Sequence, residues 1–250
     1  MSTDLISIQL LVVFRSAAER ELLRQGAGLA FVPIEVIEAD GAASAATLLA
    51  GGAIDLVLLD SVLPGAEKTS VCQAARASRH KPFIIAVGRE SDSTDVDGSI
   101  RKPATADEAQ AVIERCVRTR LPARALIVDD SATMRSIVRK ILVASRFPLE
   151  VAEVEEGIKA LNMLKQGGFD IVFLDYNMPG LNGLETLSEL RRQYPDIAVV
   201  MISSAESEDF AAQARQAGAA AFLRKPFFPA DVDAVLYRHY QIDAPQRSGR

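Results

Sequence analysis

In the second half of this sequence, polar side chains capable of chemistry follow short apolar runs. The run 171–174 ends in Asp175, and a segment rich in turn residues, 177–183, comes directly after it. Four continuous apolar residues bounded by turn signals are typical of a buried parallel strand. Ligands of open α/β sheets bind outside the carboxyl ends of the strands, which makes Asp175 the first candidate for chemistry. The alternative is that Asp175 only opens the turn or caps the next helix.

A second acidic position follows the apolar run 125–128, where Asp129 and Asp130 are adjacent. One of these acids, or Ser131, could instead cap the amphipathic helix predicted after them. If the strand order is 2-1-3-4-5, the first and third strands are neighbours, and both acids lie beside Asp175. Three carboxylates in one crevice need a cation, and hard oxygen ligands suit magnesium.

Two further strand ends carry a hydroxyl and an ammonium. Ser203 ends the predicted fourth strand, and Lys225 follows the fifth. A phosphoryl group on Asp175 would need such groups, because phosphoryl transfer depends on positioning and charge neutralisation. Each residue alone is more often a cap or a solvated side chain. Together with the three acids, they point to phosphoryl chemistry.

An internal repeat shows how these residues are positioned. The segment 54–65 matches the segment 169–180 in its apolar strand, its aspartate and the Pro-Gly pair that follows. Predicted strands are 8–14, 31–38, 56–59, 83–87 and 98–101 in the first copy, and 125–129, 149–154, 171–174, 198–203 and 221–224 in the second. Because helices separate the strands, each copy is predicted to be a doubly wound parallel five-stranded α/β sheet of order 2-1-3-4-5. We expect domains at residues 1–120 and 121–240, followed by a flexible tail at 241–250.

Composition excludes several classes of protein. The chain has 250 residues, 49% of them apolar, and a net charge of −5, which argues against a broad nucleic-acid-binding surface. Cys72 and Cys116 have neither CxxC spacing nor a histidine cluster nearby, so we expect no zinc site and a reducing, cytoplasmic location. The apolar segment 5–14 is too short to span a bilayer and is better explained as the first strand, so no membrane insertion is expected.

The motifs of the second half resemble the receiver domain of two-component response regulators, most of all chemotaxis-type receivers. The resemblance covers nearly all of residues 124–240. It rests on four segments: Asp-Asp-Ser-Ala-Thr-Met-Arg at 129–135, Leu-Asp-Tyr-Asn-Met-Pro-Gly-Leu-Asn-Gly at 174–183, Ile-Ser-Ser-Ala at 202–205, and Ala-Gly-Ala-Ala-Ala-Phe-Leu-Arg-Lys-Pro-Phe at 217–227. It implies the flavodoxin-like version of the predicted fold.

The resemblance also implies roles for the residues. Asp175 would accept a phosphoryl group from a histidine kinase or phosphotransfer protein. The chain would be a phosphoacceptor signalling protein that assists its own magnesium-dependent phosphorylation and dephosphorylation, and not an enzyme. Magnesium would be held by Asp129, Asp130, Asp175 and the backbone carbonyl of Asn177. Ser203 and Lys225 would bind the phosphoryl oxygens, and Phe222 would be a switch residue coupled to Ser203. Asn177 and Ala205 occupy positions that tune the lifetime of the phosphoryl group, and the Lys225–Pro226 bond is cis in the family.

The first copy departs from this pattern. At an offset of 115 residues, Phe14 and Arg15 replace the acid pair and Gly88 replaces the hydroxyl, while Asp60 and Lys102 remain. One carboxylate is a poor magnesium site, so we predict a degenerate pseudo-receiver with a shortened fourth helix. Our hypothesis is that the permanently charged Arg15 reaches Asp60 in place of the metal. The alternative is that Arg15 is an ordinary surface charge.

These features predict a response regulator that signals by protein contacts through the last helices of its second domain, because no DNA-binding module follows Tyr240 in this sequence. Alternatives are a phosphoryl sink or relay, and a scaffold that works independently of phosphorylation. The first domain could inhibit, dock or form a homodimer. An aspartyl-phosphate hydrolase would need a DxDx[TV] motif on the first strand, which 129–131 does not fit. A flavodoxin-like electron carrier would want a phosphate-binding loop where the acid pair stands.

Overall fold

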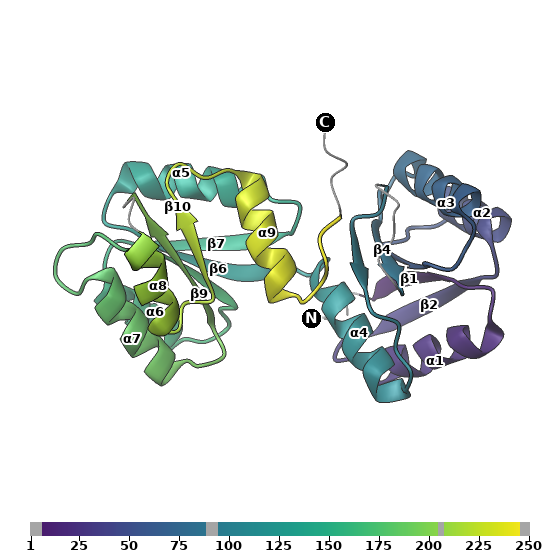
Figure 1. Ribbon diagram of the computed structural model, residues 1–250, viewed down its shortest axis with the longest axis horizontal. Helices are drawn as coiled ribbons and strands as arrows, with labels where there is room; N and C mark the ends of the chain where they lie inside the picture. Colours follow the sequence, from purple (N-terminus) through teal and green to yellow (C-terminus); the bar gives the residue numbers. More distant parts are fainter. Residues whose placement is uncertain (1–6, 89–94, 205–207, 246–250) are drawn as a thin grey trace, which may run out of the picture. The chain divides into compact units, whose positions relative to one another are not determined.

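The chain divides into two units, each built on its own five-stranded sheet. The structure is a computed structural model that describes residues 7–88, 95–204 and 208–245 (Figure 1). The first unit comprises the chain up to Arg120 together with residues from Tyr240 onward, and the second runs from Leu121 to His239. No helix among the described residues is long and apolar enough to cross a membrane.

The first unit is a parallel five-stranded sheet covered by helices on both faces. Its strands are β1 (Ile8–Val13), β2 (Ile34–Ala39), β3 (Leu56–Asp60), β4 (Phe83–Val87) and β5 (Gly98–Ile100), in the order β2-β1-β3-β4-β5. Figure 1 shows α1 (Ala17–Gly28) and α4 (Ala106–Arg118) on one face, and α2 (Ala42–Gly51) and α3 (Gly65–Ala77) on the other.

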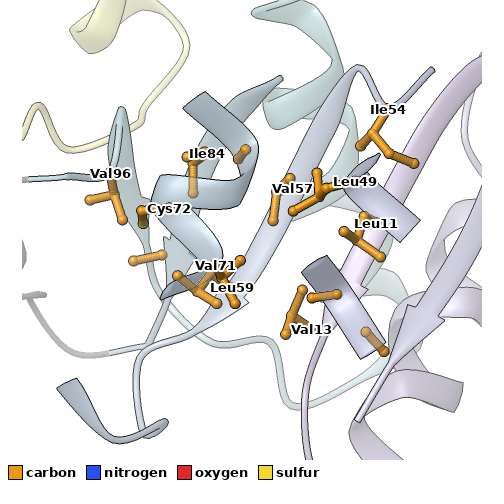
Figure 2. Packing of buried hydrophobic residues seen from close by; sticks show 14 of the residues in the cluster. Leu11, Val13, Leu49, Ile54, Val57, Leu59, Val71, Cys72, Ile84 and Val96 are labelled. Atoms are coloured by element: carbon orange, nitrogen blue, oxygen red, sulfur yellow. The ribbon is translucent and has the colours of Figure 1, made fainter. Parts of the chain in front are cut away.

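The core of the first unit lies between its sheet and the helices α2 and α3. Leu11, Val57, Leu59 and Ile84 come from three strands and belong to the same apolar cluster as Cys72 of α3, and all five side chains are buried (Figure 2). These strands are apolar on both faces, as the near-continuous runs predicted, because helices cover the sheet on both sides. Packing on both faces fixes the positions of the central strands, including their carboxyl ends. The residues that follow those ends form the candidate sites.

The second unit repeats this architecture. Its strands are β6 (Ala123–Val128), β7 (Leu149–Val154), β8 (Ile171–Asp175), β9 (Ala198–Ser203) and β10 (Ala221–Arg224), all parallel, in the order β10-β9-β8-β6-β7. Its helices are α5 (Ala132–Val143), α6 (Gly157–Leu164), α7 (Gly183–Gln193), α8 (Glu208–Gln216) and α9 (Pro229–His239). Read along the chain, both sheets have the order 2-1-3-4-5, which confirms the predicted fold class.

The two units differ between their fourth and fifth strands. In the second unit, residues 204–220 connect β9 to β10 and include α8. In the first, the connection from β4 to β5 spans only residues 88–97. No helix is found there among the described positions, 88 and 95–97, and the rest of the predicted shortened helix lies outside the described residues.

The segment after α9 packs on the first unit, where the sequence predicted a flexible tail from residue 241. Ile242 is 3% exposed, and Asp243 forms an antiparallel bridge with Ser99 of β5. The two backbone hydrogen bonds of this bridge, one in each direction between Asp243 and Ser99, are both 2.9 Å long. The sequence around Ile242 has no hydrophobic periodicity that would predict this pairing. The position of the segment depends instead on backbone hydrogen bonds to the edge strand β5.

Candidate functional site

The second unit gathers charged and hydroxyl side chains where its central strands end. Asp129 follows β6, Asp175 ends β8, Ser203 ends β9 and Lys225 follows β10. The strands are parallel and in register, with Val128 opposite Leu174 and Asp175 opposite Ile202. Their carboxyl ends therefore meet at one edge of the sheet, as the sequence predicted.

Three carboxylates form the centre of this site. One oxygen from each of Asp129, Asp130 and Asp175 lies within 4.8 Å of the others. The Lys225 ammonium donates to Asp175 Oδ1 at 2.8 Å and to Asp129 Oδ2 at 3.1 Å. Asp129 and Asp175 are buried, while Asp130 is exposed. One ammonium thus binds two of the three carboxylates, and this set of hard oxygen donors fits a divalent cation such as magnesium.

The pKa values reflect this imbalance of charge. Burial raises the pKa of the Asp175 carboxyl, the hydrogen bond from Lys225 opposes this, and the charges of Asp129 and Asp130 raise it further, so the net direction is upward. For Lys225, burial lowers the pKa, but bonds to Asp175 and Asp129 outweigh burial and the pKa lies above its usual value. The carboxylates therefore stabilise the charged form of Lys225, and its single positive charge does not neutralise all three of them.

The alternative capping roles of these acids are taken by other residues. The Ser131 hydroxyl caps α5 by accepting from the Met134 amide at 3.3 Å. Asn182 caps α7 and forms a capping box with Glu185, with both bonds at 3.0 Å. Asp175 is therefore not a helix cap, and its carboxylate is available for chemistry.

A glycine allows α7 to begin close behind Asp175. A Cβ atom on Gly183 would lie 2.6 Å from the Asp175 carbonyl oxygen and 2.7 Å from the Tyr176 Cα. Both are backbone atoms of the strand end and cannot rotate away. Only glycine therefore fits the first position of α7 while the loop from 176 to 182 remains this compact.

The other predicted residues of the second site lie around this centre. Ser203 is fully buried at the end of β9. Phe222 is half-buried in β10 and packs against the apolar core on the side of α6 and α7. Asn177 is exposed in the loop after β8, and the Lys225–Pro226 bond is cis. Ala205 lies outside the described residues.

Comparison with known proteins agrees with this geometry. The family model described as the response regulator receiver domain matches residues 125–237. The chemotaxis protein CheY-3 of Vibrio cholerae is 36% identical over 118 residues, which are 46% of this chain and 90% of that protein. The chain belongs to the response regulator receiver family. The chemotaxis protein CheY of Bacillus subtilis is 38% identical over 113 residues, 45% of this chain and 91% of that protein.

A solved structure covers both units of this response regulator. It is described as a probable two-component system response regulator/GGDEF domain protein, with a TM-score of 0.51 and 22% identity over 94% of this chain and 98% of that chain. At this identity the likeness shows the fold alone. The response regulator therefore has a tandem receiver architecture, a CheY-like second receiver and the acid triad typical of a receiver magnesium site.

The first receiver-like unit has a different arrangement around Asp60. Asp60 is buried, and the Lys102 ammonium lies 3.3 Å from its Oδ1 and 2.6 Å from Glu19 Oε1. Phe14 is buried where the second unit has Asp129, and Lys102 lies 5.4 Å from the centre of its ring. For Lys102, burial lowers the pKa, but Glu19 and Asp60 outweigh this and the net direction is upward. Within the described part of this unit no cluster of three metal-ligating side chains is found.

The hypothesis that Arg15 pairs with Asp60 is wrong. The Arg15 side chain is 62% exposed and forms its ion pair with Glu67 in the first turn of α3. Asp60 forms its ion pair with Lys102, and Arg15 pairs with Glu67 at the surface. The alternative, that Arg15 is an ordinary surface charge, agrees better with this position.

Sequence reasoning missed two residues of the first unit. Glu19, in the first turn of α1, forms an ion pair with Lys102. The equivalent position of the second unit, 115 residues later, is Met134. The replacement of an apolar residue by an acid at this position was the sequence signal that could have identified Glu19. Ser61 was also missed. A Cβ atom on Gly88, whose φ is +137°, would lie 1.9 Å from Ser61 Oγ and 3.0 Å from Ser61 Cβ. The Ser61 hydroxyl thus occupies the space into which a side chain at position 88 would extend.

Proposed function

We propose that this chain is a cytoplasmic two-component response regulator that accepts a phosphoryl group on Asp175 from a histidine kinase or a phosphotransfer protein. The observation that carries the proposal is the contact of the Lys225 ammonium with both Asp175 and Asp129, beside the third carboxylate of Asp130. This arrangement offers a nucleophilic carboxylate, a cation site and a fixed positive charge together. Phosphoryl transfer depends on these three elements.

The transfer step uses the Asp175 carboxylate as the nucleophile. One of its oxygens attacks phosphorus, a new O–P bond forms, the N–P bond of the phosphohistidine breaks, and the imidazole nitrogen keeps the electron pair. Lys225 and Ser203 would bind the phosphoryl oxygens. Magnesium, held by the three aspartates and the backbone carbonyl of Asn177, would supply further charge neutralisation.

The test is intact mass spectrometry after incubation with acetyl phosphate and magnesium. We expect one added phosphoryl group on the wild type, none on Asp175→Asn, and one on Asp60→Asn, which is the matched control because Asp60 ends the equivalent strand β3. Two groups on the wild type would refute the assignment of the first unit as inactive. No group on a folded protein that binds magnesium would refute the phosphoacceptor role itself.

The first unit is proposed to be a pseudo-receiver held in one state. Its Asp60 lacks the acid partners of a magnesium site, because Phe14 and Arg15 replace them. The Lys102 ammonium forms ion pairs with both Asp60 and Glu19, so its single positive charge is shared by two carboxylates. Such a unit would act through its surface, and sedimentation of the full chain would show whether it mediates a homodimer.

The output is proposed to be a change in affinity for a protein partner that binds the last helices of the second unit. Phosphorylation would shift a two-state equilibrium through Ser203 and Phe222. Phe228, next to the start of α9, is 64% exposed and offers an apolar contact to such a partner. Unchanged partner affinity on phosphorylation would favour the scaffold, and transfer of the group from Asp175 to another histidine would favour the sink or relay.

A further inference from the structure

A cavity of about 780 Å³ lies at the carboxyl ends of three strands in the first unit. Ser61 follows β3, Gly88 follows β4, and Arg101 and Lys102 follow β5. Ligands of parallel α/β sheets bind outside the carboxyl ends of the strands, so the cavity is in the place where a small-molecule site is expected.

The segment after α9 completes the cavity. Asp243 lines it and is held beside β5 by the bridge to Ser99, which also lines it. Ile242, the residue before Asp243, is buried. Every described residue that lines the cavity therefore belongs to the first unit, and one of the walls comes from the segment after α9.

Several hydrogen-bond donors in this cavity are unused. Neither the Ser61 and Ser99 hydroxyls nor the Arg101 guanidinium makes a hydrogen bond or ion pair with another described residue. Lys102 differs, because Asp60 and Glu19 share its ammonium. Among the described residues that line the cavity, Arg101 is therefore the cation left available to a ligand.

The lining indicates the class of ligand. A guanidinium binds phosphate through two parallel hydrogen bonds, and neighbouring hydroxyls can donate to the same oxygens. The volume is that of a site for a whole small molecule rather than for a single oxyanion. Val62, 78% exposed, offers an apolar contact, and the Asp243 carboxylate can accept from a hydroxyl or an amine.

We propose that this cavity binds a small phosphorylated metabolite, a phosphomonoester of nucleotide or sugar-phosphate size, with its phosphate on Arg101 and its body toward Val62 and Asp243. The site is independent of phosphoryl transfer to Asp175. It would give the degenerate receiver a ligand of its own in place of the lost phosphorylation chemistry.

Calorimetric titration of the full chain tests this proposal, with adenosine 5′-monophosphate and ribose 5-phosphate as probes. We expect saturable binding of at least one phosphomonoester and none of adenosine. Arg101→Gln should weaken it about tenfold or more, as expected for loss of a charge-assisted hydrogen bond. Val62→Glu, at an exposed position, should also weaken it by replacing the apolar contact to the body of the ligand with a carboxylate.

Two control variants make the result specific. Arg79→Gln removes an exposed arginine of the same unit that does not line the cavity, and Asp175→Asn removes the phosphoacceptor; neither should change the affinity. No binding of either phosphomonoester at millimolar concentration would overturn the proposal. Equal losses of affinity in Arg79→Gln and Arg101→Gln would also overturn it, because they would show nonspecific electrostatic attraction. A loss of affinity in Asp175→Asn would overturn it by placing the ligand at the site of the second unit. Inorganic phosphate binding as tightly as the esters would remove the argument for an organic body.

Discussion

Restoring a hydroxyl at position 88 should destabilise the first unit rather than repair it. In Gly88→Ser, the new Cβ would lie 1.9 Å from Ser61 Oγ and 3.0 Å from Ser61 Cβ. Rotation of the Ser61 hydroxyl relieves only the first contact. The φ of +137° adds backbone strain, because L-residues rarely adopt it.

The size of the effect follows from these two causes. Strained backbone costs about 1–3 kcal/mol, and overpacking at a filled position costs about 1–3 kcal/mol. We therefore expect Gly88→Ser to lower the free energy of unfolding by about 2–6 kcal/mol, a large part of the stability of a domain. Gly51→Ser is the matched control, since its Cβ meets nothing within 4 Å and its φ is ordinary, and it should stay within about 0.5 kcal/mol of the wild type.

The assay is urea unfolding of the wild type, both single variants and Gly88→Ser combined with Ser61→Gly. Removal of the Ser61 side chain should return about 1–3 kcal/mol, which is the overpacking part, and leave the backbone strain in place. If Gly88→Ser were as stable as the control, or if Ser61→Gly gave no recovery, the reasoning from the close contact would be refuted.

Three further outcomes are expected. Lys225→Met should slow phosphorylation of Asp175 by acetyl phosphate at least about tenfold, because a fixed positive charge at the developing phosphoryl charge is lost; an unchanged rate of mass gain would contradict this role. Burial raises the pKa of the Cys72 thiol to about 11 and of the Cys116 thiol to about 12, so an aromatic disulfide at pH 8 should label neither in the native protein and both in guanidinium, and fast native labelling would contradict their burial. Ile242→Ala should destabilise the first unit by about 2–5 kcal/mol, as for other buried large-to-small changes, and wild-type urea unfolding would show that the segment after α9 contributes no packing.

The second site followed closely from the sequence because its residues stand at strand ends. Once the order 2-1-3-4-5 is fixed, Asp129, Asp175 and Lys225 must share one edge of the sheet. The alternation of strands and helices along the sequence is then enough to predict that these side chains lie close together. The caps were left open, since Ser131 and the acids before it are all competent helix caps by residue type.

The first site could not be predicted to the same depth, because its contacts join residues with no shared periodicity. Arg15 and Lys102 both had Asp60 as a candidate partner, and the outcome depended on two other acids, Glu19 of α1 and Glu67 of α3. The order of residues 241–243 depended on a sheet edge far away in the chain. Such contacts are decided by competition among nearby charges and by backbone pairing, which a single sequence leaves open.

The changes in the first unit form one consistent alternative to a metal site. Phe14 removes a carboxylate from the strand end, and Glu19 then offers Lys102 a second partner beside Asp60. Returning only position 14 to an acid would bury a further negative charge next to Asp60, with Lys102 already shared, and unpaired buried charge is costly. Reversal would need several substitutions together, because each residue of the cluster is now stabilised by the others. We infer that the proposed loss of phosphorylation chemistry in this unit would be a property of the whole charge cluster and not of one missing aspartate.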